Sequence, residues 1–358
     1  MNSFVPQNQS DGAHVSRETG SAPGAEFVLN NGYDSYVSRE TPHWEGGPSL
    51  SAEAPEAAVV AAGAPPGGFD VEMDTPIARA ARTAMSVRGR GDDLWPRPDR
   101  CRVISVANQK GGVGKTTTTV NLAASLAMHG NRVLVVDLDP QGNASTALGM
   151  ERTQESRSIY HCLVEDEEIR ELARPVEDVP NLWCVPATID LAGAEIELVS
   201  LVAREARLKR AFAAYDSSEL DYILIDCPPS LGLLTVNAMV ACEEVLIPIQ
   251  CEYYALEGLG QLLRNVELVK SHLNPALTIS TILLTMYDGR TRLASQVADE
   301  VRGHFGELVL QSLVPRSVRV SEAPSYGQSV MTYDPGSTGA VAYMEAAREI
   351  AFRAKTAA

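Results

Sequence analysis

The sequence predicts an α/β protein with a doubly wound, mainly parallel sheet. Short, mainly apolar runs alternate with segments in which apolar residues recur at helical spacing, over most of the chain after residue 100. A glycine-rich loop follows the first apolar run and opens the first helical segment. Strands covered by helices on both faces are apolar along their length, and ligands of such sheets bind at the carboxyl ends of the strands.

The order of elements follows from the two periodicities. Six apolar runs are predicted to be strands: 102–107, 132–139, 222–228, 244–249, 279–286 and 308–315. Helices are predicted from the glycine-rich loop to Gly130 and in four later segments: 191–214, 255–272, 291–304 and 338–353. The basic run REARLKR at 204–210 is expected on the solvent face of its helix, with glutamate partners.

Residues 1–100 differ in composition from the rest of the chain. They hold 10 of the 21 prolines and 11 of the 27 glycines, and they hold no lysine. We therefore predict a disordered acidic extension over 1–100, followed by one folded domain over 101–358. One stretch, 74–88, has the composition of a short arginine-bearing helix, either a linker helix or a docking segment for a partner.

Composition also excludes several classes of protein. The formal net charge of -16 argues against a protein that coats nucleic acid by bulk charge, although it allows a local basic patch. There is no apolar run of about 18 residues that would span a membrane. The six cysteines lack metal-ligand spacing, so we expect small core residues in a reducing cytoplasm.

The stretch NQKGGVGKTTTT at 108–119 predicts a phosphate-binding loop. Glycines let backbone N–H groups approach phosphate oxygens, and the following helix adds a positive field at its first turn. The residues expected around the nucleotide are Gly111, Gly112, Val113, Gly114, Lys115, Thr116 and Thr117. Lys115 would reach the β- and γ-phosphates, Thr116 would bind Mg²⁺, and Thr117 would contact the α-phosphate. The expected cofactors are ATP and Mg²⁺, although Gln109 replaces the first glycine of the standard motif.

Three aspartates lie at the carboxyl ends of predicted strands. Asp137 and Asp139 lie in VVDLDPQGN at 135–143, and Asp226 lies in ILIDCPPS at 223–230. Because the carboxyl ends of parallel strands share one edge of the sheet, these side chains are expected beside the phosphate loop. Asp226 has the position of a Walker B carboxylate that reaches Mg²⁺. Asp137 is expected to support the shell of ligands around the metal.

The arrangement K-G-G-x-G-K-T resembles the deviant Walker A loop of the ParA/MinD group of P-loop ATPases. Further stretches across 102–353, including VDLDPQGNAS, AEIELVS, DYILIDCPPSLGLLTVNA and VPRSVRVSEAPSYGQSV, resemble ParA/Soj-type chromosome-partitioning ATPases in the same order. The resemblance implies that Lys110 reaches the nucleotide of a dimer partner, and that Asp139 positions the attacking water. From the residues alone, Lys110 could equally neutralise charge in its own subunit. The resemblance also places Pro315 and Arg316 near the adenine.

The function implied is ATP-dependent dimerisation for bacterial chromosome segregation. The resemblance implies a homodimer that binds nonspecific double-stranded DNA on the nucleoid, and release after hydrolysis stimulated by a ParB-like centromere-binding protein. Arg290 and Arg319 lie where ParA relatives carry DNA-contacting arginines, although each is also compatible with an ordinary surface residue. Part of the dimer surface is expected at 252–261, where Tyr253, Tyr254 and Leu256 could equally be core residues.

Other members of the deviant group fit the sequence less well. MinD-type proteins end in an amphipathic membrane helix, whereas the end of this chain is alanine-rich, so no membrane partner is expected. Iron proteins need cysteines placed for a cluster, and dethiobiotin synthetase-like enzymes need an acceptor site that the sequence does not reveal. A different class stays open: an ATP-dependent adaptor that positions a protein cargo or polar scaffold docked through residues 1–100.

Overall fold

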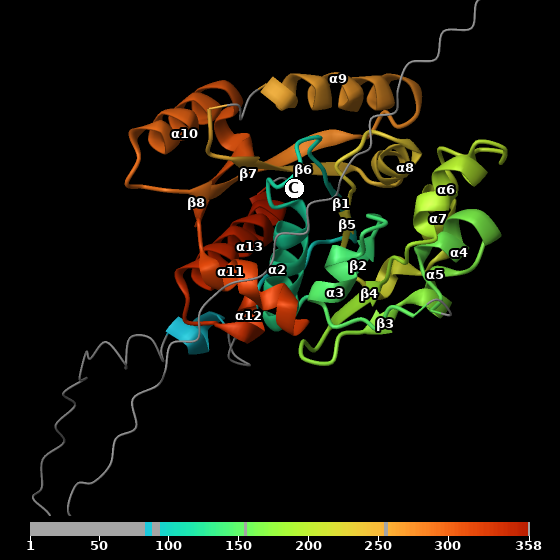
Figure 1. Cartoon of the computed structure of the whole chain (residues 1–358), viewed down its shortest axis with the longest axis horizontal. Helices are drawn as coiled ribbons and strands as arrows, with labels where there is room; N and C mark the ends of the chain where they lie inside the picture. Colours follow the sequence, from blue (N-terminus) through green and yellow to red (C-terminus); the bar gives the residue numbers. More distant parts are fainter. Residues whose placement is uncertain (1–82, 88–93, 154–155, 254–256, 357–358) are drawn as a thin grey trace, which may run out of the picture. The chain divides into compact units, whose positions relative to one another are not determined.

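The computed structural model describes residues 83–87, 94–153, 156–253 and 257–356 (Figure 1). Tyr254, Leu256 and most of the predicted extension lie outside the described residues. The chain divides into two units, Met1–Phe69 and Asp70–Ala358, and the fold described below belongs to the second unit.

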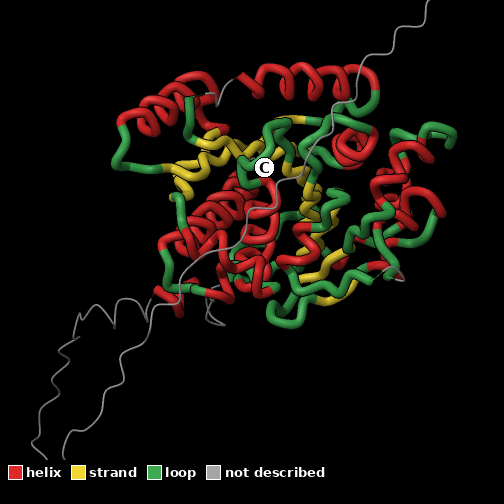
Figure 2. The backbone as a smooth tube through the Cα atoms, in the orientation of Figure 1, coloured by secondary structure: helices red, strands yellow, loops and turns green. Residues whose placement is uncertain are grey.

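An eight-stranded sheet forms the centre of the fold (Figure 2). Its strand order is β3-β4-β2-β5-β1-β6-β7-β8, and every neighbouring pair is parallel except β3 with β4. The strands are β1 Arg102–Val106, β2 Val133–Asp137, β3 Arg174–Pro175, β4 Leu182–Val185, β5 Tyr222–Asp226, β6 Glu244–Gln250, β7 Thr278–Tyr287 and β8 Val309–Pro315. This confirms the predicted doubly wound, mainly parallel sheet, and it adds the edge strand β3 and its neighbour β4.

Helices cover both faces of the sheet (Figure 1). They are α2 Lys115–Met128, α3 Asn143–Ala147, α4 Ile159–Glu165, α5 Ile169–Leu172, α6 Leu191–Leu198, α7 Arg207–Ala214, α8 Leu233–Ala241, α9 Glu257–His272, α10 Arg292–Phe305, α11 Val318–Glu322, α12 Val330–Tyr333 and α13 Thr338–Thr356. In β2, Val133 and Val135 enter one hydrophobic core, with residues of α2 and α13, whereas Leu134 and Val136 enter the other, with residues of α8 and α9. Because successive side chains point to opposite faces of the sheet, β2 contributes residues to both cores.

The prediction of a single helix over 191–214 is wrong, because the segment breaks between α6 and α7. Ala203, inside the break, has a left-handed backbone with φ 52°. Arg207 is also not on the solvent face, since its side chain is only 7% exposed. Its guanidinium donates to the carbonyl oxygens of Leu163 and Val164 and pairs with Asp166, so tertiary contacts outweigh the polar sequence pattern.

Two short stretches before residue 101 pack against the folded unit. Residues 83–87 are helical, and the side chain of Val87 is fully buried in the core that contains α2. Trp95 is 9% exposed and stacks on His129, with ring centroids 3.8 Å apart. These contacts pack part of the predicted extension against the folded domain.

The remaining composition-based expectations concern thiols and membranes. Five of the six cysteines are buried, and Cys101 is partly buried, as expected for core thiols. Within the described residues, no helix combines the length and apolar character needed to cross a membrane. In α13, the apolar side chains of Tyr343 and Ile350 are buried in the core beside α2.

Candidate nucleotide site and its charged surroundings

The predicted phosphate loop joins β1 to α2. Gly112 and Gly114 have φ angles of 74° and 89°, in the left-handed region that residues with a Cβ rarely adopt. Gly114 is the N-cap of α2, so the first backbone N–H groups of the helix face the loop. A Cβ built on Gly111 or Gly112 meets no described atom within 4 Å, which leaves the outer side of the loop open. This is the local geometry that a phosphate group requires.

Hydrogen bonds join this loop to the neighbouring strands β6 and β7. The side-chain amide of Asn108 donates to the carbonyl of Pro248 in β6 at 2.8 Å, and its oxygen accepts from the backbone N–H of Lys110 at 3.0 Å. The hydroxyl of Thr285 in β7 donates to the carbonyl of Val113 at 2.8 Å. Asn108 stood inside the quoted motif, but no local signal in the sequence marks Thr285 as a residue of the site.

The two lysines of the loop have different surroundings. Lys115 is 7% exposed, and its Nζ donates to the carbonyl of Lys110 at 3.2 Å. Burial lowers the pKa of Lys115, while Asp226 acts in the opposite direction. The amine of Lys110 instead leaves the loop and lies 3.8 Å from a carboxylate oxygen of Glu252. Lys115 is therefore placed inside its own site, and Lys110 is placed at the surface of that site.

Asp226 ends β5 directly behind the loop. Its carboxylate accepts hydrogen bonds from the hydroxyls of Thr116 at 2.7 Å and Thr119 at 3.2 Å. Asp226 is fully buried beside Asp137 of β2, and burial followed by repulsion from Asp137 raises its pKa. Mg²⁺ usually takes one or two protein oxygens and completes its shell with phosphates and water. The adjacent hydroxyl and carboxylate of Thr116 and Asp226 fit that requirement.

No described group of three or more histidine, cysteine, aspartate or glutamate side chains is arranged to hold a metal by itself. The fit of Mg²⁺ therefore depends on oxygens that the nucleotide would supply.

Asp137 and Asp139 have different hydrogen-bond partners. Both oxygens of Asp137 accept hydrogen bonds from the following loop: Oδ1 from the N–H of Asp139 at 3.1 Å, and Oδ2 from the N–H and hydroxyl of Ser145. Asp137 is fully buried, and burial raises its pKa to about 6. Asp139 is 8% exposed, and its Oδ1 accepts from the N–H of Gln141. Asp137 therefore shapes the loop that presents Asp139.

A hollow of about 270 Å³ lies beside Thr116 and Thr117. It is lined by residues of α2, α3 and the chain from α11 to α12, including Asn121, Val320, Pro324 and Gln328. Pro315 and Arg316 do not line it. Arg316 instead pairs with Glu252 at 3.3 Å. Val320 and Pro324 lie in VPRSVRVSEAPSYGQSV, on which the ParA/Soj resemblance rests, whereas no local signal marks Asn121 as a residue of the site.

The two arginines expected to contact DNA form ion pairs within the chain. Arg290 is exposed and binds Asp288 through two nitrogens, at 2.9 and 2.8 Å, which lowers the pKa of Asp288 to about 2. Arg319 pairs with Glu322 at 3.1 Å and with Asp334 at 3.3 Å. The two arginines therefore belong to separate groups of charges, one before α10 and one in α11.

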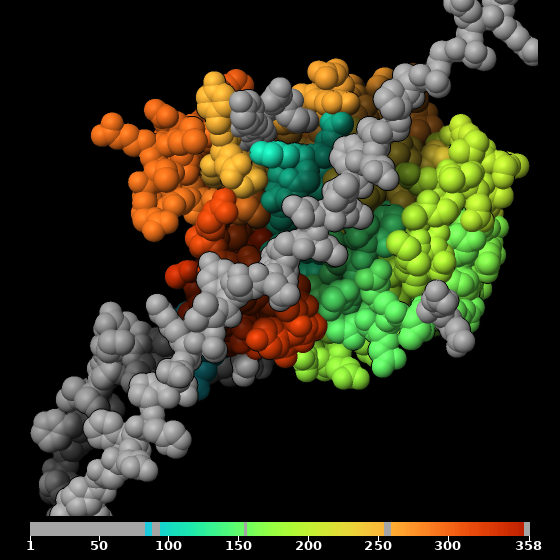
Figure 3. Space-filling model, in the orientation of Figure 1, coloured from blue at the N-terminus to red at the C-terminus, as the bar shows by residue number. Residues whose placement is uncertain are grey.

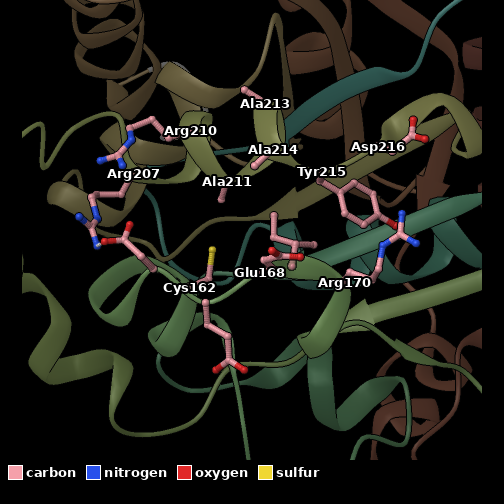
Figure 4. Close-up of a pocket in the computed structure, with 13 residues that line it drawn as sticks. Cys162, Glu168, Arg170, Arg207, Arg210, Ala211, Ala213, Ala214, Tyr215 and Asp216 are labelled. Carbon is pink, nitrogen blue, oxygen red and sulfur yellow. Dashed lines mark ion pairs between the residues drawn. The ribbon is translucent and has the colours of Figure 1, made fainter.

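A larger hollow, of about 680 Å³, lies between the α4–α5 region and α7 (Figure 4). In its lining, Arg207 pairs with Asp166, and the Arg170 guanidinium lies 6.0 Å from the ring centroid of Tyr215. None of the predicted site residues lines it. In Figure 3 the teal residues of the phosphate-loop region instead reach the surface beside the orange C-terminal half of the chain.

Comparison with known proteins decides the family. A protein-family model described as an AAA domain matches residues 101–279. The chain is 54% identical over 250 residues to the sporulation initiation inhibitor protein Soj of Bacillus subtilis, covering 70% of this chain and 98% of Soj. It is 52% identical over 262 residues to the chromosome partitioning protein ParA of Myxococcus xanthus, covering 73% of this chain and 91% of that protein. The chain belongs to the ParA/Soj family of chromosome-partitioning ATPases.

Solved structures agree with this ParA/Soj fold. A Mycobacterium smegmatis structure named cobyrinic acid a,c-diamide synthase, with bound ADP and magnesium, is 39% identical. It has a TM-score of 0.63 and covers 72% of this chain and 97% of its own. The septum site-determining protein MinD of Pyrococcus horikoshii, complexed with Mg-ADP, is 26% identical with a TM-score of 0.56 and covers 70% of this chain and 96% of its own. The match to ParA/Soj confirms the resemblance drawn from the motifs.

Proposed function

We propose that this ParA/Soj chain dimerises with bound ATP, holds nonspecific DNA in that state and releases it after hydrolysis. The proposal depends on the different positions of the two lysines of the phosphate loop. Lys115 is buried within its own loop, whereas the amine of Lys110 is outside it and forms an ion pair with Glu252. One lysine is thus available to its own nucleotide and one to a neighbouring molecule.

The nucleotide would be held by the loop between β1 and α2. Backbone N–H groups of residues 111–117 and the amine of Lys115 bind the phosphates, and Thr116 with Asp226 holds Mg²⁺. The nucleoside would occupy the hollow lined by Asn121, Val320 and Pro324. Bound Mg-ATP supplies the transferable phosphoryl group and a metal that neutralises its charge.

Asp139 is proposed to position the attacking water. Its Oδ1 accepts a hydrogen bond from the backbone N–H of Gln141, and Asp137 holds the loop that carries it. Positioning by a fixed carboxylate is how this class of site accelerates hydrolysis without a strong base. Stimulation by a ParB-like protein would act on this hydrolysis step.

DNA binding would require Arg290 and Arg319 to exchange a carboxylate for a phosphate. Both ion pairs are at the surface, where such pairs contribute little to stability, so phosphates can compete with them. A dimer doubles the number of such contacts, and each added contact steepens the dependence of affinity on salt. Dimerisation can therefore switch DNA binding on in a chain whose net charge is negative, and such binding would place the protein on the nucleoid in the cytoplasm.

The test is fluorescence anisotropy of random duplex DNA titrated with the full chain, in ATP and in ADP, at two salt concentrations. We expect binding in ATP only, weaker at high salt, and lost in Lys115→Ala and in Lys110→Ala. Lys209→Ala is the matched control, because Lys209 is exposed on α7 away from the loop.

Absence of ATP-dependent DNA binding would overturn the proposal. It would favour the second reading, an ATP-dependent adaptor for a protein cargo or polar scaffold. In that case cargo binding should require residues 1–82 and should persist in Arg290→Ala.

A further inference from the structure

Glu252 connects two loops of the nucleotide site that are distant in sequence. It lies two residues beyond β6, and the sheet order places β6 between β1 and β7. One carboxylate oxygen lies 3.8 Å from the amine of Lys110, and the other lies 3.3 Å from the guanidinium of Arg316. The same carboxylate therefore contacts the phosphate loop and the loop after β8.

Glu252 has two further partners besides Lys110. Gln250, at the end of β6, is 9% exposed and donates its side-chain amide to Glu252. Arg316 is anchored by its backbone N–H to the carbonyl of Tyr287 at the end of β7. Lys110 has a flexible stem, and its side chain is 33% exposed. Of the two cationic partners, Lys110 is farther from Glu252, at 3.8 Å against 3.3 Å for Arg316, so it is the more weakly held.

We propose that Glu252 is a positioning residue for Lys110, which it holds on its own subunit until an ATP-bound partner supplies stronger anionic groups. The proposal rests on the function proposed above, in which Lys110 reaches the partner's nucleotide. A triphosphate carries several negative charges and Glu252 carries one, so Lys110 transfers when the two loaded subunits meet. In the absence of ATP, the ion pair favours the monomer, because breaking it must precede the contact across the interface.

Dimerisation of the Glu252→Gln variant tests this directly. With a slowly hydrolysed ATP analogue, sedimentation equilibrium of the full chain should show a dimer dissociation constant lowered by about 1.4- to 5-fold, the range expected for loss of one exposed ion pair. Glu243→Gln is the matched control: Glu243 is at the opposite end of β6, has a side chain 49% exposed against 47% for Glu252, and also pairs with an arginine.

The double variant separates the effect on Lys110 from a general effect on the loop. In a Lys110→Ala background, Glu252→Gln should no longer change the dissociation constant. An effect of equal size in that background, or a dimer weakened by Glu252→Gln in the native background, would overturn the positioning role.

Trace acetylation of the nucleotide-free chain gives a readout that does not depend on dimerisation. The yield at Lys110, relative to exposed Lys209, should rise in Glu252→Gln and stay constant in Glu243→Gln. A native chain that remains monomeric with the analogue would overturn the proposed function and, with it, the role of Glu252 in dimerisation. A native dimer with no change in either measurement would overturn only the role of Glu252.

Discussion

The hydroxyl of Thr116 donates a 2.7 Å hydrogen bond to the buried carboxylate of Asp226, which joins the first turn of α2 to the end of β5. We expect Thr116→Ala to weaken binding of Mg-ATP by about 10- to 100-fold, the usual cost of losing an oxygen close to a metal. Binding of ATP in EDTA should change little, because Lys115 and the backbone N–H groups remain.

Isothermal titration calorimetry with and without magnesium measures both quantities. The control is Thr278→Ala, an exposed threonine at the start of β7. Equal losses with and without magnesium would contradict the assignment of Thr116 to the metal.

Asp139→Ala should separate binding from hydrolysis. We expect phosphate release to fall by about 100-fold or more, the lower range for loss of a group that assists proton transfer or orients the nucleophile. ATP binding and ATP-dependent dimerisation should persist, because the phosphate loop and Asp226 are untouched. Single-turnover phosphate release together with sedimentation checks this, and a variant that fails to bind ATP would show that Asp139 supports the fold of the site instead.

Asp288→Asn should strengthen DNA binding. The substitution removes the charge that engages Arg290 through two nitrogens, and so frees its guanidinium for phosphate. We expect an affinity for random duplex DNA about 2- to 5-fold higher at low salt, with a smaller gain at high salt. The gain should vanish in Arg290→Ala, and persistence there would exclude Arg290 as the DNA contact.

The contribution of Asp137 to the stability of the nucleotide-free chain should fall as pH rises through the folded pKa of this group. Burial raises the pKa of Asp137 to about 6, above the value near 3.9 of an unfolded chain. A group whose pKa is raised on folding stabilises the fold fully below its unfolded pKa, and this contribution is lost as pH rises through the folded pKa.

Denaturant titrations at several pH values should therefore show the native chain losing about 1–2 kcal/mol between pH 5 and pH 7 relative to Asp137→Asn. The control Asp178→Asn, at an exposed position, should follow the native chain. Parallel pH profiles for native and Asp137→Asn chains would contradict the raised pKa.

The contact of Trp95 with His129 should stabilise the whole folded unit. Trp95→Ala removes a nearly buried ring from the end of α2, so we expect a loss of about 3 kcal/mol in the free energy of unfolding. Leu94→Ala is the matched control, because Leu94 is 68% exposed and should cost less than about 1 kcal/mol. Equal effects would mean that this stretch does not belong to the domain.

The sequence was sufficient for the parts of the fold that depend on local pattern. The apolar runs marked six strands, and the glycines of the phosphate loop marked positions where the backbone needs a left-handed conformation, as at Gly112 and Gly114. The aspartates at strand ends lie together because parallel strands end at one edge of the sheet, so Asp137 and Asp226 are neighbours in register. The edge strand β3 and its neighbour β4 were missed, since two to four residues are too few to show a period.

The sequence by itself determined six of the eight strands, the phosphate loop and the two lysines, because each depends on backbone geometry within about ten residues. Tertiary structure decided which charged side chains form ion pairs. Lys110 and Glu252 are 142 residues apart in the chain, and only the position of β6 beside β1 brings them together. Arg207 looked solvent-exposed in its basic run, yet distant carbonyl groups and a carboxylate provide the partners that allow its burial. Ion pairs and burial depend on neighbours supplied by the packed sheet, and no local pattern contains them.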